Sequence, residues 1–267
     1  MNEVIVKQIA LEENITEKQI LNTLKLLEEG NTIPFIARYR KEATNGLDET
    51  KIKKIETVYQ YQINLLKRKE DVIRLIEGKD MMTDELKQKI LSATKLIEIE
   101  DLYRPYKEKK KTKATIAIAD GLEGLAKIIL SFPLNKAPED IAKTYKCKVE
   151  STEKKLEGAS YIISEYISDN ANYRKYIRNY IVKNGTIKSK IKKGKEVEDE
   201  NKIYEMYYEY EEQIKHVKPH RILALNRGEK EGILNVKINF DQDKIEDYLQ
   251  KKIIKNKDSL VCSLVIN

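Results

Sequence analysis

The chain has 267 residues, of which 40% are hydrophobic and 36% are charged. This apolar content is enough for a packed core and excludes an intrinsically disordered chain. A net charge of +7 fits an anionic partner, but 51 basic against 44 acidic side chains is too small an excess to identify one. No apolar run is long enough to cross a membrane and no signal-peptide layout is present, so we expect a cytoplasmic protein with no membrane partner.

The first part of the chain predicts an array of amphipathic helices, because apolar residues recur every three or four positions over most of the first 180 residues. Thr16 begins a helix over about 17–29 with a capping box. Pro34 opens a second helix, which Asn45-Gly46 ends. Two helices joined by so short a turn predict a helix-turn-helix-like unit.

Longer helical segments follow. Asp48 caps a helix of about 30 residues that ends at Gly78, and Thr83 caps another to about Glu98. Short helices are predicted up to Ser131. A further helical stretch is predicted over about 153–184, with a buried side formed by Tyr161, Ile162, Tyr166, Tyr173, Tyr176, Ile177, Tyr180 and Ile181.

The pattern changes beyond Gly185, where a lysine-rich stretch gives way to an acidic, tyrosine-rich one. We interpret this segment as a mobile hairpin or a charged excursion. The segment PHRILALNRGEKEGIL predicts a short helix from Pro219 to Gly228, and the alternation in ILNVKINF predicts a half-exposed strand. The apolar ending SLVCSLVIN suggests a piece of a longer polypeptide.

The predicted fold is therefore mainly α: a helical array that begins with the helix-turn-helix-like unit and a long helix, with a small β element late in the chain. We place these first elements in one domain, residues 1–78. Residues 79–267 form a second helical region with the β element, which we expect to continue past the last residue.

Motifs for catalysis are missing. No glycine-rich phosphate loop, nucleophile elbow or Cys/His signature occurs, and Cys147 and Cys262 form no CxxC pair. His216 and His220 have the spacing of metal ligands, but Pro219 lies between them and no third ligand is near in sequence. The many carboxylates resemble solvated helix faces. We therefore expect no enzyme, no metal and no cofactor.

Three cations on the second predicted helix form a first candidate site. Arg38, Arg40 and Lys41 follow a tight turn, in a position from which basic side chains could contact nucleic-acid phosphates. Phe35 and Tyr39 stack at i, i+4 on the same helix. The alternative is that the basic groups pin the turn by pairing with carboxylates, namely Glu42, Asp48 or Glu49.

A second candidate site is the connection from Arg104 to Lys113. Tyr103 and Tyr106 could stack on bases beside its cations. The alternative is a solvated linker. Its basic residues are Arg104, Lys107, Lys109, Lys110, Lys111 and Lys113. A weaker group precedes an acidic run that would neutralise it, and comprises Lys188, Lys190, Lys192, Lys193 and Lys195.

Three stretches together resemble the Tex family of bacterial transcription accessory proteins, which carry an S1 RNA-binding domain. They are TIPFIARYRKEATNGLDE (32–49), DLYRPYKEKKKTKATIAIADGLEGLA (101–126) and HRILALNRGEKEGIL (220–234), in the family's order. The resemblance covers essentially the whole chain. It implies the mostly helical N-terminal region of such a protein, beginning with a helix-turn-helix-like unit.

The resemblance also implies nucleic-acid binding, to RNA, DNA or both, in transcription. Family members continue with a RuvC-like nuclease-related domain, helix-hairpin-helix units and the S1 domain, which is the expected main binder. None of these occurs in this sequence, so we expect a chain that is truncated before them. The resemblance names no catalytic residue here.

Two functions follow from the sequence. The first is a non-enzymatic helical module that assists nucleic-acid binding through the two cationic segments. The second is a structural scaffold that docks the missing domains or a transcription partner, with its cations serving folding and solubility. A scaffold should expose an apolar patch near residues 234–240 or 260–266.

Overall fold

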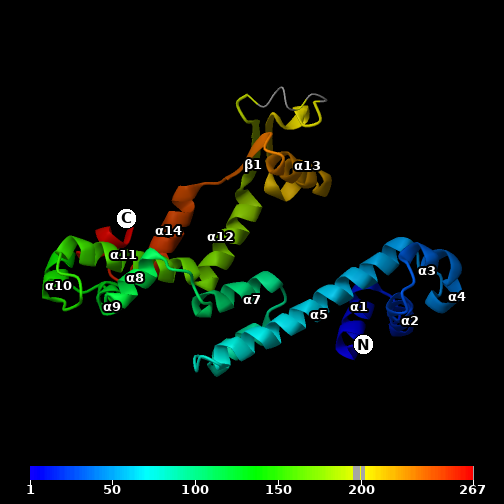
Figure 1. Cartoon of the computed structure of the whole chain (residues 1–267), viewed down its shortest axis with the longest axis horizontal. Coiled ribbons are helices and arrows are strands. Elements are labelled where there is room, and N and C mark those ends of the chain that lie inside the picture. The colour runs from blue at the N-terminus through cyan, green and yellow to red at the C-terminus, as the bar shows by residue number, and fades with distance from the viewer. Residues whose placement is uncertain (195–198, 200–201, 267) are drawn as a thin grey trace. The chain divides into compact units, whose positions relative to one another are not determined.

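The computed structural model describes residues 1–194, 199 and 202–266. Within these residues it contains fifteen α-helices and one three-stranded sheet (Figure 1). The prediction of a mainly α-helical chain with a small β element late in the sequence is confirmed. The chain divides into two compact units, Met1–Tyr106 and Lys107–Asn267. Every helix in the described part of the chain is too short or too polar to cross a lipid bilayer.

The first unit begins with a helix that sequence reasoning did not assign, α1 (Glu3–Glu13). Its next elements are α2 (Glu17–Glu28), α3 (Ile33–Tyr39), α4 (Lys41–Thr44) and α5 (Glu49–Glu77). The predicted capping box is present: the amide of Gln19 donates to Thr16 Oγ1, and the amide of Thr16 donates to Gln19 Oε1. Gly30 turns the chain between α2 and α3 with φ of 84°. The predicted second helix is two helices, because Arg40 leaves helical geometry at φ −124° and ψ 27°.

The long helix α5 spans 29 residues and supports two cores. Its beginning matches the prediction, since Asp48 accepts a hydrogen bond from the amide of Lys51 at 2.8 Å. Its first half packs on α1 to α3 through the fully buried Ile36, Ile52 and Ile55.

The second half of α5 packs on α6 (Asp84–Ser92) and α7 (Leu96–Tyr103), ahead of the short 3-10 helix η1 (Arg104–Tyr106). The single helix predicted after Thr83 is therefore two helices, separated where Ala93 is extended with ψ of 133°. Val72 and Ile76 share a core with Ile90 and Ile99. For this reason the predicted boundary after Gly78 falls inside the first unit.

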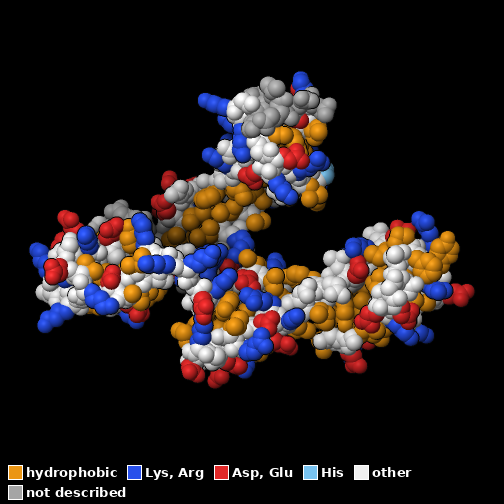
Figure 2. All heavy atoms as spheres, in the orientation of Figure 1, with side chains coloured by type: hydrophobic (Ala, Val, Ile, Leu, Met, Phe, Trp, Pro, Cys, Tyr) orange, Lys and Arg blue, Asp and Glu red, His pale blue; other side chains and the backbone are white. Residues whose placement is uncertain are grey.

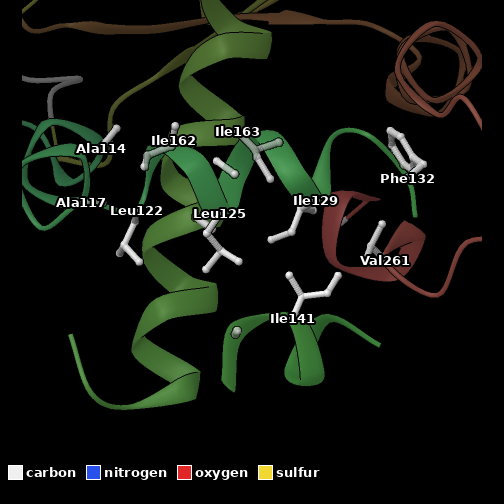
Figure 3. Close-up of a cluster of buried hydrophobic side chains, with 13 residues drawn as sticks. Ala114, Ala117, Leu122, Leu125, Ile129, Phe132, Ile141, Ile162, Ile163 and Val261 are labelled. Carbon is white, nitrogen blue, oxygen red and sulfur yellow. The ribbon is translucent and has the colours of Figure 1, made fainter. Parts of the chain in front are cut away.

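The second unit is built around α11. Its helices are α8 (Lys113–Ala119), α9 (Glu123–Ile129), α10 (Pro138–Thr144), α11 (Thr152–Asp169), α12 (Ala171–Asn184), α13 (Pro219–Lys230), α14 (Gln242–Ile253) and α15 (Cys262–Ile266). Leu125, Ile129 and Ile162 are fully buried in its core, and Val261 joins them from near the end of the chain (Figure 3). Gly158 lets α11 pack closely, because a Cβ at this position would lie 2.4 Å from Leu122 Cδ1.

The predicted helix over 153–184 is interrupted at Asn170, whose side chain caps α12. The predicted buried side is right for Ile162, but Tyr161 is only half-buried and Tyr166 is exposed. It is also wrong for α12, which has no buried residue. Tyr173, Tyr176 and Ile177 are only half-buried, because they pack against α14 on one side. Helix α14 was not predicted.

A small antiparallel sheet lies between α12 and α14 in sequence. Its strands are β1 (Thr186–Ile191), β2 (Glu209–Gln213) and β3 (Leu234–Asn239), in the order β2-β1-β3. The predicted strand is β3. The segment interpreted as a hairpin or charged excursion forms β1 and β2, paired in part through Lys188 and Glu211 at 2.9 Å.

Helix α13 packs on β3 and continues to Lys230, two residues past its predicted end at Gly228. Gly228 serves close packing, since a Cβ there would lie 2.6 Å from Leu234 Cδ1. Gly232, with φ of 80°, turns the chain after the helix.

Three carboxylates accept hydrogen bonds in and around this sheet and α13, and Glu212 of β2 joins the sheet to Arg221 of α13. The pKa values of Asp199, Glu212 and Glu231 all lie below the ordinary carboxyl value, because each carboxylate accepts hydrogen bonds. At Asp199, burial acts in the opposite direction and raises the pKa, but the hydrogen bonds outweigh it. Asp199 accepts from the backbone amides of Ile203 and Tyr204 and from the Tyr208 hydroxyl. Glu212 accepts from the Tyr210 hydroxyl and from Arg221, and Glu231 accepts from Arg227 and from the Tyr204 hydroxyl.

Acid should therefore weaken this part of the second unit. A carboxyl group whose pKa is depressed in the folded state stabilises the fold at pH values above its ordinary pKa of about 4. This stabilisation is lost as the pH falls through the depressed pKa. The double variant E212Q/E231Q should be less stable than the wild type at neutral pH and should lose less stability between about pH 5 and pH 2. Urea unfolding followed by tyrosine fluorescence at each pH measures this. Glu229→Gln, an exposed neighbour on α13, should keep the wild-type pH profile.

Candidate functional site

The three cations of the first candidate site all face solvent. Arg38 Nη2 lies 3.7 Å from Glu49 Oε1, with 69% and 51% of the two side chains exposed. An ion pair this open contributes about 0–1 kcal/mol. Lys41 is exposed as well. Among the residues that the structure describes, neither Arg40 nor Lys41 forms an ion pair.

The alternative interpretation, in which a nearby carboxylate pins this turn, is met at one position by the exposed pair of Arg38 and Glu49. Asp48 is occupied as the cap of α5. Within the described residues, Glu42 forms no ion pair with Arg38, Arg40 or Lys41. Arg40 instead places its guanidinium 5.3 Å from the centroid of the Phe35 ring. The basic groups of α3 and α4 are therefore available to an anion in solution.

The second candidate site separates into cations that contact side chains of α11 and cations that do not. Lys109 is half-buried and forms ion pairs with two carboxylates of α11, Glu165 at 2.7 Å and Asp169. Lys113 Nζ donates to Tyr161 Oη at 2.9 Å and lies 4.5 Å from the centroid of that ring. These two lysines fasten the connection to α11.

Electrostatics agree with a structural role for Lys109. Burial would lower the pKa of the Lys109 ammonium, but hydrogen bonds to Asp169 and Glu165 outweigh burial and raise it. The lysine is therefore charged at all physiological pH values, with its charge already neutralised by two partners. It has little left to offer a phosphate.

Lys107, Lys110 and Lys111 are exposed, and none of them forms an ion pair within the described residues. Arg104 is exposed too, but it belongs to the first unit, at the beginning of η1. Tyr103 is buried and packs in the core of α5 to α7, so it offers no stacking surface. Tyr106 is half-buried against the same core.

The weaker lysine group has mixed surroundings. Lys188 pairs with Glu211 across β1 and β2. Lys190, Lys192 and Lys193 are exposed. Lys195 lies outside the described residues. Basic and acidic side chains are interspersed over much of the face shown in Figure 2.

A groove along α12 was missed by sequence reasoning. It has a volume of about 720 Å³ and lies between α12 and α14, where Figure 2 shows a patch of apolar side chains. Its apolar lining comes from Tyr173, Ile177, Ile181, Val182, Ile214, Ile238, Leu249, Ile253, Ile254, Val265 and Ile266, with further contributions from Ile167. The i, i+4 spacing of Tyr173, Ile177 and Ile181 was the available signal, but it was assigned to a buried core.

Two late stretches expose the apolar surface expected of a scaffold. Ile238 and Phe240 are exposed by 52% and 41%, and Leu260 and Ile266 by 56% and 48%.

No group of three potential ligands that could hold a metal ion occurs among the described residues. The features to explain are thus two sets of exposed cations and one apolar groove.

Comparison with known proteins identifies the relatives of the chain. Residues 3–77 match the family described as Tex-like protein N-terminal domain, and residues 134–260 match the Tex central region-like family. Uncharacterized protein YdcI of Bacillus subtilis is 51% identical over 96% of the chain and 36% of its own length. Transcriptional accessory protein Tex of Neisseria gonorrhoeae is 35% identical over 90% of the chain and 31% of its length.

A human relative, S1 RNA-binding domain-containing protein 1, is 30% identical over 96% of the chain and 26% of its own length. The chain thus spans about a third or less of these relatives. The two matching families describe the N-terminal and central parts of Tex-like proteins, and they match this chain in that order. Together they cover most of the sequence. The chain therefore belongs to the Tex family.

Proposed function

We propose that this chain is a non-enzymatic helical module of a Tex-like transcription accessory protein that assists the binding of RNA or DNA. The cations that contact the phosphates are Arg38, Arg40 and Lys41 on α3 and α4, and Lys107, Lys110 and Lys111 ahead of α8. Lys109, Lys113 and Arg104 are left with structural roles. Binding is electrostatic and independent of sequence.

One observation carries this proposal: five of these six cations are exposed and form no ion pair with any described residue. Lysines and arginines that bind phosphate need this freedom, because an existing carboxylate partner would have to be displaced. Two relatives support the kind of ligand, since their names refer to transcription and to an RNA-binding domain.

The test is a mobility-shift titration of the 267-residue chain with single-stranded and duplex oligonucleotides in about 50 mM salt. Non-specific binding of this kind predicts a dissociation constant of about 1–100 μM. Variants with Arg40 and Lys41 changed to alanine should bind several-fold more weakly. Absence of any shift at about 100 μM protein would contradict the proposal.

The alternative function is a scaffold, and the groove between α12 and α14 favours it. Apolar residues one helical turn apart on two neighbouring helices form the kind of groove that accepts an amphipathic helix. In this alternative, the groove holds a helix from the remaining length of a Tex-like protein. The exposed cations then serve solubility alone.

The two functions differ in how they respond to a change in the groove. Ile177→Asp and Leu249→Asp place charges among its apolar side chains. If the chain is a nucleic-acid module, oligonucleotide binding should change by less than about two-fold in these variants. If it is only a scaffold, the wild type should bind no oligonucleotide, and the variants should disrupt the fold or activity of the longer protein.

A further inference from the structure

Two aromatic side chains of α3 lie on the surface, although neighbours on the same helix are buried. Phe35 is 37% exposed and Tyr39 is 69% exposed, whereas Ile36 and Ala37 pack in the core. Neither ring belongs to that core. Two large rings exposed one helical turn apart offer a flat apolar surface to a ligand.

The rings form a compact group with a cation. Their centroids lie 5.3 Å apart with the planes tilted by 44°, and the guanidinium of Arg40 lies 5.3 Å from the Phe35 centroid. The i, i+4 contact itself stabilises a helix only slightly. An apolar pair of leucines would serve that purpose equally well, so helix stability does not account for two rings.

The surroundings of the rings are basic. Arg38 and Lys41 are exposed on the same pair of short helices, α3 and α4. A nucleic-acid strand whose phosphates contact these cations would bring its bases near the rings, because every nucleotide along the strand carries both a phosphate and a base. Stacking of bases on aromatic rings, with a contribution from arginine, is the usual way in which proteins hold single strands.

We propose that Phe35, Tyr39 and Arg40 form a stacking platform for unpaired bases, so that the preferred ligand of this segment is single-stranded nucleic acid. This inference rests on the proposed function, because the cations must first hold the strand. The bases of a duplex are stacked on each other and cannot reach the rings. The platform therefore adds affinity for single strands alone and should not discriminate among base types.

The test is fluorescence anisotropy with three labelled probes of about 12 nucleotides, oligo-uridine RNA, oligo-thymidine DNA and duplex DNA. The double variant F35L/Y39L keeps an apolar surface and removes both rings. It should bind either single strand about ten-fold more weakly or worse, while duplex binding changes by less than about two-fold. The salt dependence should stay the same, because stacking releases no counterions.

Two control variants separate stacking from other effects. The exchange F35Y/Y39F keeps both rings and should retain wild-type affinity. Leu11→Ala removes another exposed apolar side chain, 86% exposed on α1, and should also bind as the wild type does. With 5-iodouridine in the RNA probe, photocrosslinking and mass spectrometry should locate the adduct on Phe35 or Tyr39.

The outcomes distinguish this inference from the function on which it rests. If the wild type binds none of the three probes, both are wrong. If it binds all three but the F35L/Y39L variant binds single strands as well as the wild type does, only the platform is wrong. Equal weakening of single strands and duplex, or a crosslink outside residues 32–49, would overturn the platform as well. If only one of the two single-stranded probes depends on the rings, the platform stands and its ligand is RNA or DNA accordingly.

Discussion

Changing Lys107, Lys110 and Lys111 together to glutamate should weaken nucleic-acid binding by about two orders of magnitude in about 0.1 M salt. Each lysine that neutralises a phosphate releases condensed counterions, and that gain is lost when the charge is removed. The new glutamate carboxylates also repel the phosphates, which weakens binding further. The fold should survive, because all three side chains are exposed and none pairs with a described residue.

A matched triple variant separates a local contact from a general charge effect. K136E/K146E/K154E changes the net charge by the same amount, also at exposed lysines of the second unit. It should weaken binding by less than about five-fold. If the two triple variants weaken binding equally, the segment before α8 is not the contact, and binding reflects only the overall charge. Fluorescence anisotropy at constant ionic strength measures both.

Replacing Lys109 with alanine should have the opposite profile, a large effect on stability and a small one on binding. The change would leave Glu165 and Asp169, which are 20% and 8% exposed, without their shared cation. Breaking a buried pair costs about 3–5 kcal/mol and a surface pair about 0–1 kcal/mol. For these partly buried groups we expect a loss of about 1–3 kcal/mol in the free energy of unfolding of the second unit.

Lys110→Ala is the control for this prediction, since Lys110 is the exposed neighbour of Lys109. It should change stability by less than about 0.5 kcal/mol. Urea unfolding followed by circular dichroism measures both variants, and binding by the folded fraction of Lys109→Ala should stay within about three-fold of the wild type. A loss of affinity without a loss of stability would assign Lys109 to the interface instead.

The sequence predicted best those features that depend on neighbouring residues. Thr16 and Asp48 begin helices where expected, because a capping side chain bonds to amides within the next three residues. The left-handed Asn45 and Gly46 end α4 for an equally local reason. The strand β3 was visible from its alternating pattern.

Features that depend on distant partners were missed. The carboxylate Asp169 that neutralises Lys109 lies 60 residues further along the chain. The strands β1 and β2 are rich in lysine and glutamate, yet Ile187, Ile191 and Tyr210 pack against a core formed with Leu225 and Leu234, and Lys188 pairs with Glu211 across the two strands.

In the candidate site, too, the sequence showed the local features but not those that depend on distant residues. The density of basic residues between Arg104 and Lys113 predicted a candidate binding site, but the fold uses Lys109 and Lys113 for contacts with α11. Residue type alone cannot tell a lysine that contacts α11 from one that does not. The exposed rings of Phe35 and Tyr39 were seen in the sequence as a stacked pair, but their exposure became evident only from the packing of Ile36 and Ala37 on the opposite side.

The salt dependence of binding tests the electrostatic interface most directly. With about five phosphate contacts, a plot of log affinity against log salt concentration should have a slope of about −3.5 for a single strand. In K107E/K110E/K111E the slope should become shallower by about 2, whereas K136E/K146E/K154E should keep the wild-type value. A wild-type slope near zero, or the same slope in both triple variants, would contradict an interface built from these cations.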